Sequence, residues 1–258
     1  MTRSPRCFLM LPMGTTHVQT NPMPAAVAAV AAFRDEFRRD HIGARYRGWL
    51  HLAFTAGLCL LVIAVCGVSL QDVGPAEWLT IPVTALYANL VEYFGHRGPM
   101  HHRVRGLGLI YERHAGQHHR FFRDDLMAFD TSRDFKAVLF PPVLIVFYLL
   151  AFAMPAGLML AWLFSDNVAL LFVITAVAYF LNYELLHFAY HAAPQSWLSR
   201  LPLMDRLRRL HTLHHRPGLM QRYNFNITYP VGDLLFGTLY RQPTGCEGSR
   251  QTDQSPAR

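Results

Sequence analysis

Four apolar stretches, each long enough to cross a bilayer as one helix, constrain the fold of this chain more than any other feature. They cover residues 49–70, 78–94, 137–164 and 168–186. Only Glu92 and Glu184 place a charge inside them. A helix needs about 20 apolar residues to cross the hydrocarbon core. Charged residues make up only 16% of the chain, against roughly 25% in a typical soluble domain. We therefore expect an all-α, polytopic membrane protein with four transmembrane helices.

The basic residues indicate how these helices are oriented. The chain has 24 Lys and Arg against 17 Asp and Glu, a net charge of +7. All 24 fall within 1–48, 96–136 and 187–258, and the two short connectors between paired stretches contain none. Because positive charge is retained on the cytoplasmic side, we expect both termini and the middle segment to be cytoplasmic. Charge sorted in this way reflects topology, so we expect no nucleic-acid partner. Lys136 is the only lysine, a preference for Arg that suggests a GC-rich bacterium and hence an inner membrane.

The chain divides into three regions by composition. They are an N-terminal leader with a following helix at 1–48, a membrane domain at 49–241 and a flexible tail at 242–258. The first 20 residues look like an unstructured leader, and Met13 or Met23 could be the true start. Residues 24–40 are predicted to be helical, because Pro stands near their start and Gly43 follows them. This helix could lie at the membrane interface with its arginines toward lipid headgroups, or it could be a solvated helix ahead of the membrane.

Eleven of the 14 histidines fall into four groups. The groups are His96, His101 and His102; His114, His118 and His119; His187 and His191; and His211, His214 and His215. Residues three or four apart share a helix face, so His187 with His191, His114 with His118, and His211 with His214 and His215 are each expected to converge on one point. All four groups follow the second and fourth apolar stretches, so they should meet in one helical cap on the cytosolic side. The other three, His17, His41 and His51, are expected to be ordinary surface or core residues.

The clustered histidines indicate a site for two metal ions. Imidazoles packed together without a metal would leave many buried donors and acceptors unpaired. One zinc or iron ion takes four to six ligands, so ten or eleven histidines suit two ions. Imidazole binds iron, zinc, copper and nickel, and the spacing does not choose among them. The four cysteines form no CxxC pair, which argues against a thiolate zinc site or a disulfide framework.

Other motifs of catalysis are missing from the sequence. It contains no HExxH, GxSxG, Walker or GxGxxG pattern, which argues against a zinc protease of that class, a serine hydrolase, a P-loop enzyme and a dinucleotide-binding enzyme. A cage of neutral imidazoles beside lipid suits dioxygen chemistry on an unreactive C–H bond better than hydrolysis.

The ordered motifs HRGPMH, HAGQHH, HFAYH and HTLHH, followed by NFNITYPVGDLLFGT, resemble the fatty acid hydroxylase/sterol desaturase superfamily of membrane di-iron oxygenases. The resemblance covers about residues 49–241. It implies two iron ions, or zinc in the isolated protein, with dioxygen as co-substrate. It also implies hydroxylation, or sometimes desaturation, of a membrane lipid such as a fatty acyl chain or a sterol-like molecule. The closing motif is most like that of the fatty acid 2-hydroxylase branch. The ligands it implies are His96, His101, His114, His118, His119, His187, His191, His211, His214 and His215.

Three features of the sequence limit what can be inferred from this resemblance. The first motif offers both His101 and His102 as a ligand, and we favour His101. Asn226 stands where the family commonly has glycine. No b-type cytochrome domain precedes the first apolar stretch, so we expect the electrons to come from a separate donor protein.

Polar residues near the histidines are candidate supports for the ligands. Glu92 lies four residues before His96, and Glu184 lies three before His187. Each carboxylate could accept the second imidazole N–H and orient the ring, or it could be a half-buried partner of an arginine. Asn224 and Asp233 in the closing motif could act likewise, or they could serve a turn or a helix cap.

Two functions of other classes also fit the composition. A divalent-metal transporter would place its ionisable ligands near the bilayer midplane, whereas these groups gather at the ends of the apolar stretches. A zinc-binding membrane enzyme without redox chemistry would use the same histidines.

Overall fold

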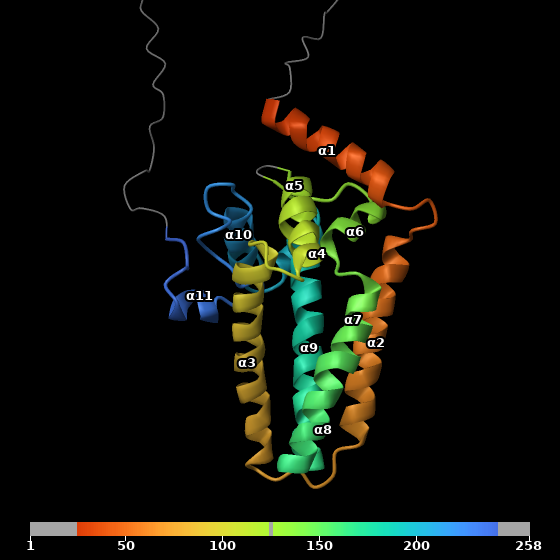
Figure 1. The fold of residues 1–258 in the computed structure, drawn as a ribbon, viewed down its shortest axis with the longest axis vertical. Helices are drawn as coiled ribbons and strands as arrows, with labels where there is room; N and C mark the ends of the chain where they lie inside the picture. Colours follow the sequence, from red (N-terminus) through yellow and green to blue (C-terminus); the bar gives the residue numbers. More distant parts are fainter. Residues whose placement is uncertain (1–24, 124–125, 242–258) are drawn as a thin grey trace, which may run out of the picture.

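Parallel helical rods form the body of the chain in the computed structural model, which describes residues 25–123 and 126–241 (Figure 1). The rods are α2 (Gly48–Val68), α3 (Thr80–Gly95), α7 with α8 (Pro142–Tyr148 and Met154–Leu163) and α9 (Asp166–Tyr190). α9 packs against α2, α3 and α8 and is therefore the central rod. Apart from one isolated bridge between Arg123 and Leu126, the described residues form no β-structure, which confirms the prediction of an all-helical chain.

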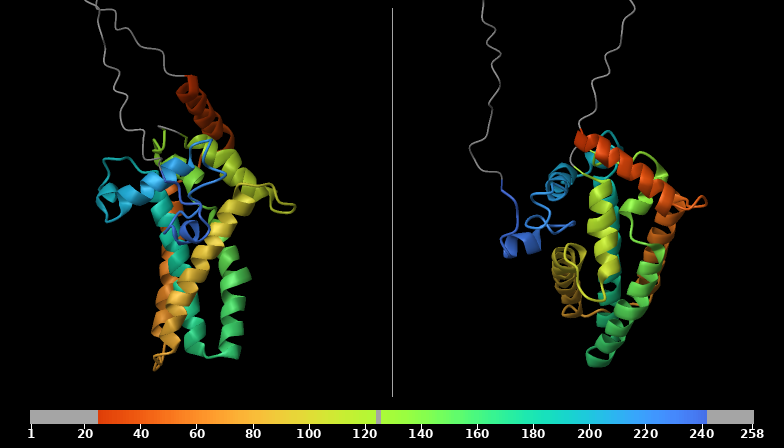
Figure 2. Two further views of the ribbon diagram at one scale, coloured as in Figure 1. Left: turned by 90° about the vertical axis from the view of Figure 1, so that its left-hand side faces the viewer. Right: turned by 45° about the horizontal axis from the view of Figure 1, so that its top comes forward.

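Shorter elements gather at one end of the rods and form what we call the cap (Figures 1 and 2). Its α-helices are α1 (Ala25–His41), α4 (Gly108–Tyr111), α5 (His119–Phe121), α6 (Phe135–Val138), α10 (Met204–His214) and α11 (Val231–Leu235). Two π-helical segments, His96–Met100 and Glu112–His118, lie in the cap, and a third, Leu149–Ala153, joins α7 to α8. Short 3-10 turns cover Glu77–Leu79, Ser132–Asp134 and Trp197–Arg200.

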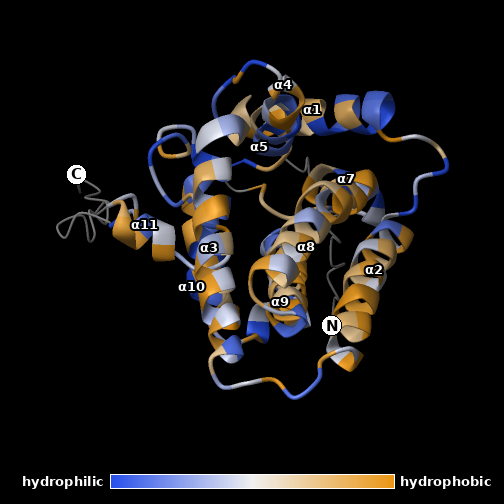
Figure 3. Ribbon diagram, turned by 60° about the horizontal axis from the view of Figure 1, so that its bottom comes forward, coloured by the Kyte–Doolittle hydropathy of each residue, from blue (hydrophilic) through white to orange (hydrophobic). Residues whose placement is uncertain are grey.

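Three of the rods have the length and composition of membrane-spanning helices. These segments are Gly48–Val68, Ser132–Leu163 and Asp166–Tyr190. The expected fourth span corresponds to α3, whose 16 residues make it about 24 Å long and leave it outside this set. α3 nevertheless exposes apolar side chains such as Val83, which is 65% exposed, and the rods are hydrophobic along most of their length (Figure 3). The fourth transmembrane helix stays a prediction.

The end opposite the cap holds only the two short connectors, and hydrogen bonds join them. Ser165 caps α9, because its hydroxyl accepts the N–H of Val168 at 3.2 Å, and it also donates to Glu77 in the other connector. Asn167 accepts the N–H of Gln71 at 3.1 Å and donates to its carbonyl at 2.6 Å. The two helical hairpins are therefore tied at this end.

A proline break separates the cap from the third rod. The apolar stretch 137–164 is not one helix, because α6 ends before Pro141 and α7 begins at Pro142. A broken helix survives in a membrane only where the freed backbone groups find partners. Phe140 meets this requirement, since its carbonyl contacts His51 Nε2 at 2.9 Å and its N–H donates to Glu184 at 3.2 Å. His51 is thus a core residue with both ring nitrogens in hydrogen bonds.

The helix predicted over 24–40 is present as α1, but two of its arginines do not face outward. Arg34 is only 4% exposed, and Arg38 donates to the buried Asp134 at 2.8 Å. Both side chains bind the segment packed beneath α1. The expectation of headgroup or solvent contacts is wrong for the buried Arg34, whereas Arg38 keeps 27% of its side chain exposed. Arg39 is exposed. The predicted leader at 1–20 and the tail at 242–258 lie outside the described residues.

Gly48 at the start of α2 is required by a close approach of two backbones. A Cβ added there would lie 1.8 Å from the carbonyl oxygen of Ser132. We predict that Gly48→Ala lowers the free energy of unfolding by about 3 kcal/mol. The added methyl group would clash with the backbone of Ser132, which cannot move as a side chain could, and overpacking of this kind costs up to about that much. Thermal unfolding in detergent measures the effect.

Gly57→Ala in the same helix is the matched control, since nothing lies within 4 Å of its added Cβ. If the two variants were equally stable, the close approach of Gly48 to the Ser132 backbone would not constrain the fold.

Candidate metal centre

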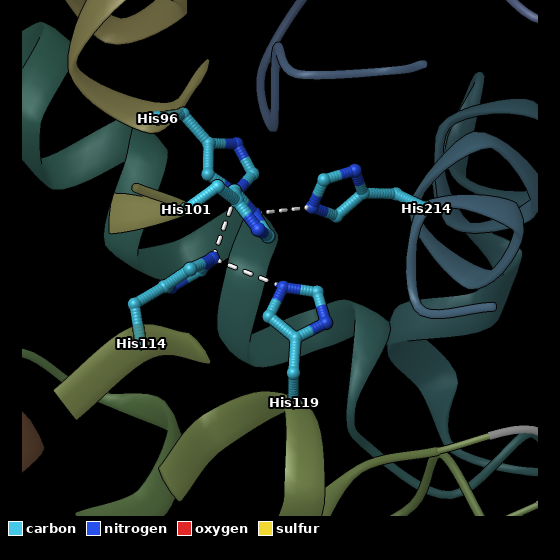
Figure 4. Close-up of side chains that lie close together, drawn as sticks. All are labelled: His96, His101, His114, His119 and His214. Atoms are coloured by element: carbon cyan, nitrogen blue, oxygen red, sulfur yellow. Dashed lines mark hydrogen bonds between the residues drawn. The ribbon is translucent and has the colours of Figure 1, made fainter. Parts of the chain in front are cut away.

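Ten buried histidines meet inside the cap, where they form two adjoining sets. The first cluster is His96, His101, His114, His119 and His214, and the second cluster is His118, His187, His191 and His211. In each cluster one nitrogen per ring lies within 4.8 Å of all the others. Figure 4 shows the rings of the first cluster pointing toward a common centre. His215 lies between the clusters, with its Nε2 3.0 Å from His211 Nε2 and its ring stacked 4.2 Å from that of His119.

The local helix type decides which histidines share a cluster. In a π-helix residues five apart lie above one another, and the π-helical segments bring together His96 with His101 and His114 with His119. The expectation that His114 converges with His118 is therefore wrong, since His118 belongs to the second cluster.

The regular helices bring their histidines together at other spacings. His187 and His191 lie in one cluster, at the end of α9. On α10, His211 contacts His215 four residues later, whereas His214 points into the first cluster. The expected convergence of His211 with His214 is wrong, because α10 supplies His211 to the second cluster and His214 to the first.

Backbone carbonyls fix the orientation of five rings. In each case Nδ1 contacts a carbonyl oxygen, which can only accept a hydrogen bond, so Nδ1 carries the proton and Nε2 keeps its lone pair. The pairs are His96 with Phe225, His118 with Ala137 at 2.9 Å, His191 with Met127 at 2.8 Å, His214 with Tyr223 at 2.9 Å and His215 with Phe122 at 2.5 Å.

Within each cluster, the Nε2 atom of a ring oriented in this way lies at short range from the Nε2 atom of a neighbouring ring. His101 Nε2 lies 3.1 Å from His96 Nε2 and 3.0 Å from His214 Nε2. In the second cluster, the separation of Nε2 atoms is 3.1 Å for His187 with His118 and 3.0 Å for His191 with His211. Two Nε2 lone pairs at this distance repel unless a proton or a metal cation lies between them, and zinc and iron sites use neutral imidazole nitrogens that converge in this way. The residues present therefore fit one metal ion in each cluster.

Burial keeps these rings neutral, as metal ligands must be. Burial lowers the pKa of His118 and of His214 to about 4. It also lowers the pKa of His119 well below its ordinary value, and the neighbouring rings lower it further. The buried Nδ1 atoms of His101, His119 and His211 have no hydrogen-bond partner.

His101 and His102 have different surroundings. His101 is 1% exposed and lies in the first cluster. His102 is exposed, and its Nδ1 contacts the carbonyl of Arg97 at 2.9 Å. Of His101 and His102, His101 is therefore the one positioned to bind a metal ion.

Glu92 supports the site by a route that the sequence did not indicate. It accepts hydrogen bonds from the backbone N–H groups of Ile227 and Thr228, from the Thr228 hydroxyl at 2.6 Å and from the Tyr179 hydroxyl at 2.6 Å. It contacts no imidazole of the described residues and no arginine, so both expectations for it are wrong. Glu92 instead attaches the segment after α10 to α3.

Glu184 likewise contacts neither an imidazole nor an arginine among the described residues. One of its oxygens accepts the N–H of Phe140 at 3.2 Å, and the other is buried without a partner. Glu184 therefore binds the backbone at the proline break, and the prediction that it orients the His187 ring is wrong.

Asp233 and the adjoining turn hold the carbonyls that orient the first cluster. Asp233 accepts the N–H of Phe225 at 2.9 Å and of Asn226 at 2.8 Å, and Phe225 in turn bonds His96. Asn224 has a φ of 57°, a left-handed conformation that Asn tolerates. Its side chain binds no imidazole: it donates to the carbonyl of Leu210 at 3.0 Å and accepts the N–H of Tyr240 at 2.9 Å. The Asn226 amide donates to the carbonyl of Asn89 in α3 at 3.1 Å.

Sequence reasoning missed Asn89. Its side chain donates to the carbonyl of Tyr229 at 2.8 Å and accepts the N–H of Gly232 at 3.1 Å. The sequence did contain a signal for it, because Asn89 is a polar residue in an apolar stretch and lies one helical turn before Glu92. The carbonyl acceptors leave no signal, because any residue type supplies a carbonyl.

A cavity of about 410 Å³ runs from the first cluster into the rods. His96 and Met100 lie at one end, and Thr84 and Phe172 lie toward the other. Most of its lining is apolar or aromatic and comes from α3, α8, α9 and the segment joining α7 to α8. Tyr183 also lines it, and its buried hydroxyl has no partner.

Comparison with known proteins gives two matches. Residues 81–238, more than half of the chain, match the model of the fatty acid hydroxylase family. A solved structure of full-length Scs7p, in which only the hydroxylase domain is visible, is similar with a TM-score of 0.53 and 16% identity, over 76% of this chain and 67% of that one. At this identity the likeness supports the fold alone. No curated protein sequence matches. From the matched residues, which include all four histidine groups, the chain belongs to the fatty acid hydroxylase family.

Proposed function

We propose that this protein is a membrane lipid hydroxylase that uses two iron ions and dioxygen. The observation that carries the proposal is the meeting of an apolar cavity with a cluster of inward-facing imidazoles at His96. A lipid hydroxylase needs both features, because an unreactive C–H bond must be held beside a redox-active centre and away from water.

The two clusters would hold one ion each. His96, His101, His114, His119 and His214 would bind the first ion, and His118, His187, His191 and His211 the second, with His215 beside them. Bound iron supplies the redox chemistry by which dioxygen is activated. One oxygen atom enters the C–H bond and the other leaves as water, with two electrons and two protons consumed. Zinc could occupy the same ligands in isolated protein.

The shape of the cavity favours a long apolar substrate. Thr84 and His96 both line it, and they are twelve residues apart on α3 and its extension, which corresponds to about 18 Å along a helix. An acyl chain lying between α3 and α9 would bring one methylene to the first cluster. A sterol-like molecule and desaturation in place of hydroxylation are the alternatives, and product analysis separates them.

We infer an orientation in which α2, α3, α7 with α8, and α9 cross a bacterial inner membrane and the cap and both termini are cytoplasmic. The support is the exclusion of Lys and Arg from the two connectors at the opposite end. Electrons would then reach the cap from a separate cytoplasmic donor protein, and the lipid would enter from the bilayer.

Replacing two ligands of the second cluster tests the metal assignment. We predict that the His187→Ala/His191→Ala variant retains at most one ion per chain and forms no hydroxylated lipid, because half of the four ligands are gone. Metal content by mass spectrometry and comparative lipid profiling of expressing cells give the two readouts.

His102→Ala is the matched control, since this exposed imidazole contacts only the Arg97 backbone, and it should retain both ions and activity. Full activity of the double variant would refute the site assignment. Zinc alone in anaerobically purified protein, with no iron-dependent oxygen uptake, would support a zinc enzyme or a metal transporter instead.

Filling the cavity tests the substrate assignment. Ala176 of α9 lines the cavity, so we predict that Ala176→Leu lowers hydroxylation of long chains about tenfold and spares shorter ones, because the added methyls occupy the path of the chain. Product chain lengths by mass spectrometry measure the shift.

Ala161→Leu is the control, because Ala161 of α8 lines a separate groove between α2, α8 and α9. An unchanged chain-length profile in Ala176→Leu would mean that the substrate lies elsewhere.

A further inference from the structure

Carbonyls of the segment that follows α5 orient His191 of the second cluster and the adjoining His215. His191 Nδ1 donates to the carbonyl of Met127 at 2.8 Å, and His215 Nδ1 donates to that of Phe122 at 2.5 Å. Phe129 N–H donates in return to the carbonyl of His191 at 2.9 Å. The positions of these carbonyls therefore set the directions in which the two Nε2 lone pairs point.

Arg34 of α1 binds the residue directly before each of those carbonyls. Its Nε donates to the carbonyl of Phe121 at 2.9 Å, and a terminal nitrogen donates to that of Leu126 at 2.5 Å. The side chain is 4% exposed, and its guanidinium lies over the Phe121 ring at 4.8 Å. A single planar group thus holds two points of the segment at a fixed separation, next to Phe122 and Met127.

Other contacts seat α1 firmly on this segment. Phe37 packs edge-on against Phe121 with ring centres 5.4 Å apart. Arg38 donates to both oxygens of the buried Asp134 at 2.8 Å, and Asp134 accepts the N–H of Asp130 at 2.9 Å. α1 therefore packs across α5 and is held there by these contacts (Figure 1).

We propose that Arg34 is a positioning residue for the metal ion of the second cluster, so that α1 is part of the metal centre although it lies outside the family-matched residues 81–238. The inference rests on the proposed function, because it presumes two bound ions. It predicts an unequal effect on the two ions. The carbonyls that orient the first cluster belong to Phe225 and Tyr223, which Arg34 does not contact.

Arg34→Met tests the proposal, because it keeps the length and apolar contacts of the side chain and removes its hydrogen bonds to the two carbonyls together with its ion pair to Asp130 at 3.4 Å. One of the two ions should leave to a chelator faster than in the parent protein, by up to the roughly 10–100-fold that loss of a ligand's direct hydrogen-bond partner costs, because Arg34 holds those partners in place. The other ion should leave at the parent rate. Arg39→Met on the same helix is the matched control, since Arg39 is 70% exposed and, among the residues that the structure describes, its ion pair is with the neighbouring Asp40.

Combined variants identify which ion is affected. Added to His101→Ala, which removes a ligand of the first cluster, Arg34→Met should leave a nearly metal-free chain. Added to His187→Ala, which already weakens the second cluster, it should change metal content little. Coupling of this kind is expected only for residues that act on the same site.

Three results would overturn the inference: parent-like release of both ions, equal acceleration of both, or additivity with His187→Ala. If Arg34→Met does not fold, Arg34→Lys carries the same test, because one ammonium keeps the charge but cannot reach both carbonyls in the geometry of the fork. A parent protein without two ions would instead contradict the proposed function.

Discussion

Imidazole rings turned by backbone carbonyls are the interaction on which the rest of this structure depends. A carbonyl that accepts from Nδ1 leaves the Nε2 lone pair free, and five rings are set in this way by Phe122, Met127, Ala137, Tyr223 and Phe225. Nε2 atoms brought within about 3 Å of one another in a buried site must share a proton or a metal cation. Much of the cap serves to place these carbonyls. Asp233 accepts the N–H of Phe225, and Arg34 donates to the carbonyls of Phe121 and Leu126, the residues directly before Phe122 and Met127.

The helical rods enclose an apolar cavity that reaches the first histidine cluster. α9 is central because it packs on the other rods and delivers His187 and His191 at its cap end. Its Ala176 also lines the cavity that leads to His96 at the end of α3. One helix therefore connects an apolar channel to the imidazoles, and the connectors tied through Ser165 and Glu77 hold α3 and α9 in register at the opposite end.

The sequence predicted the helical fold and the gathering of the histidines, because hydropathy and charge depend on residue type alone. It did not predict how the rings divide, since spacing was interpreted with α-helical geometry whereas His96 with His101 and His114 with His119 follow the π-helical period. Glu92 and Glu184 were placed near ligands but bind backbone N–H groups instead. Arg34 gave no signal among several arginines, because its role depends on a segment about ninety residues away.

The central claim is that the two histidine clusters bind two separate iron ions. Anomalous scattering at the iron edge from crystals of anaerobically purified protein tests it most directly. We expect two peaks, one bounded by His96, His101, His114, His119 and His214 and the other by His118, His187, His191 and His211. A single peak, or no iron at either position, would contradict it.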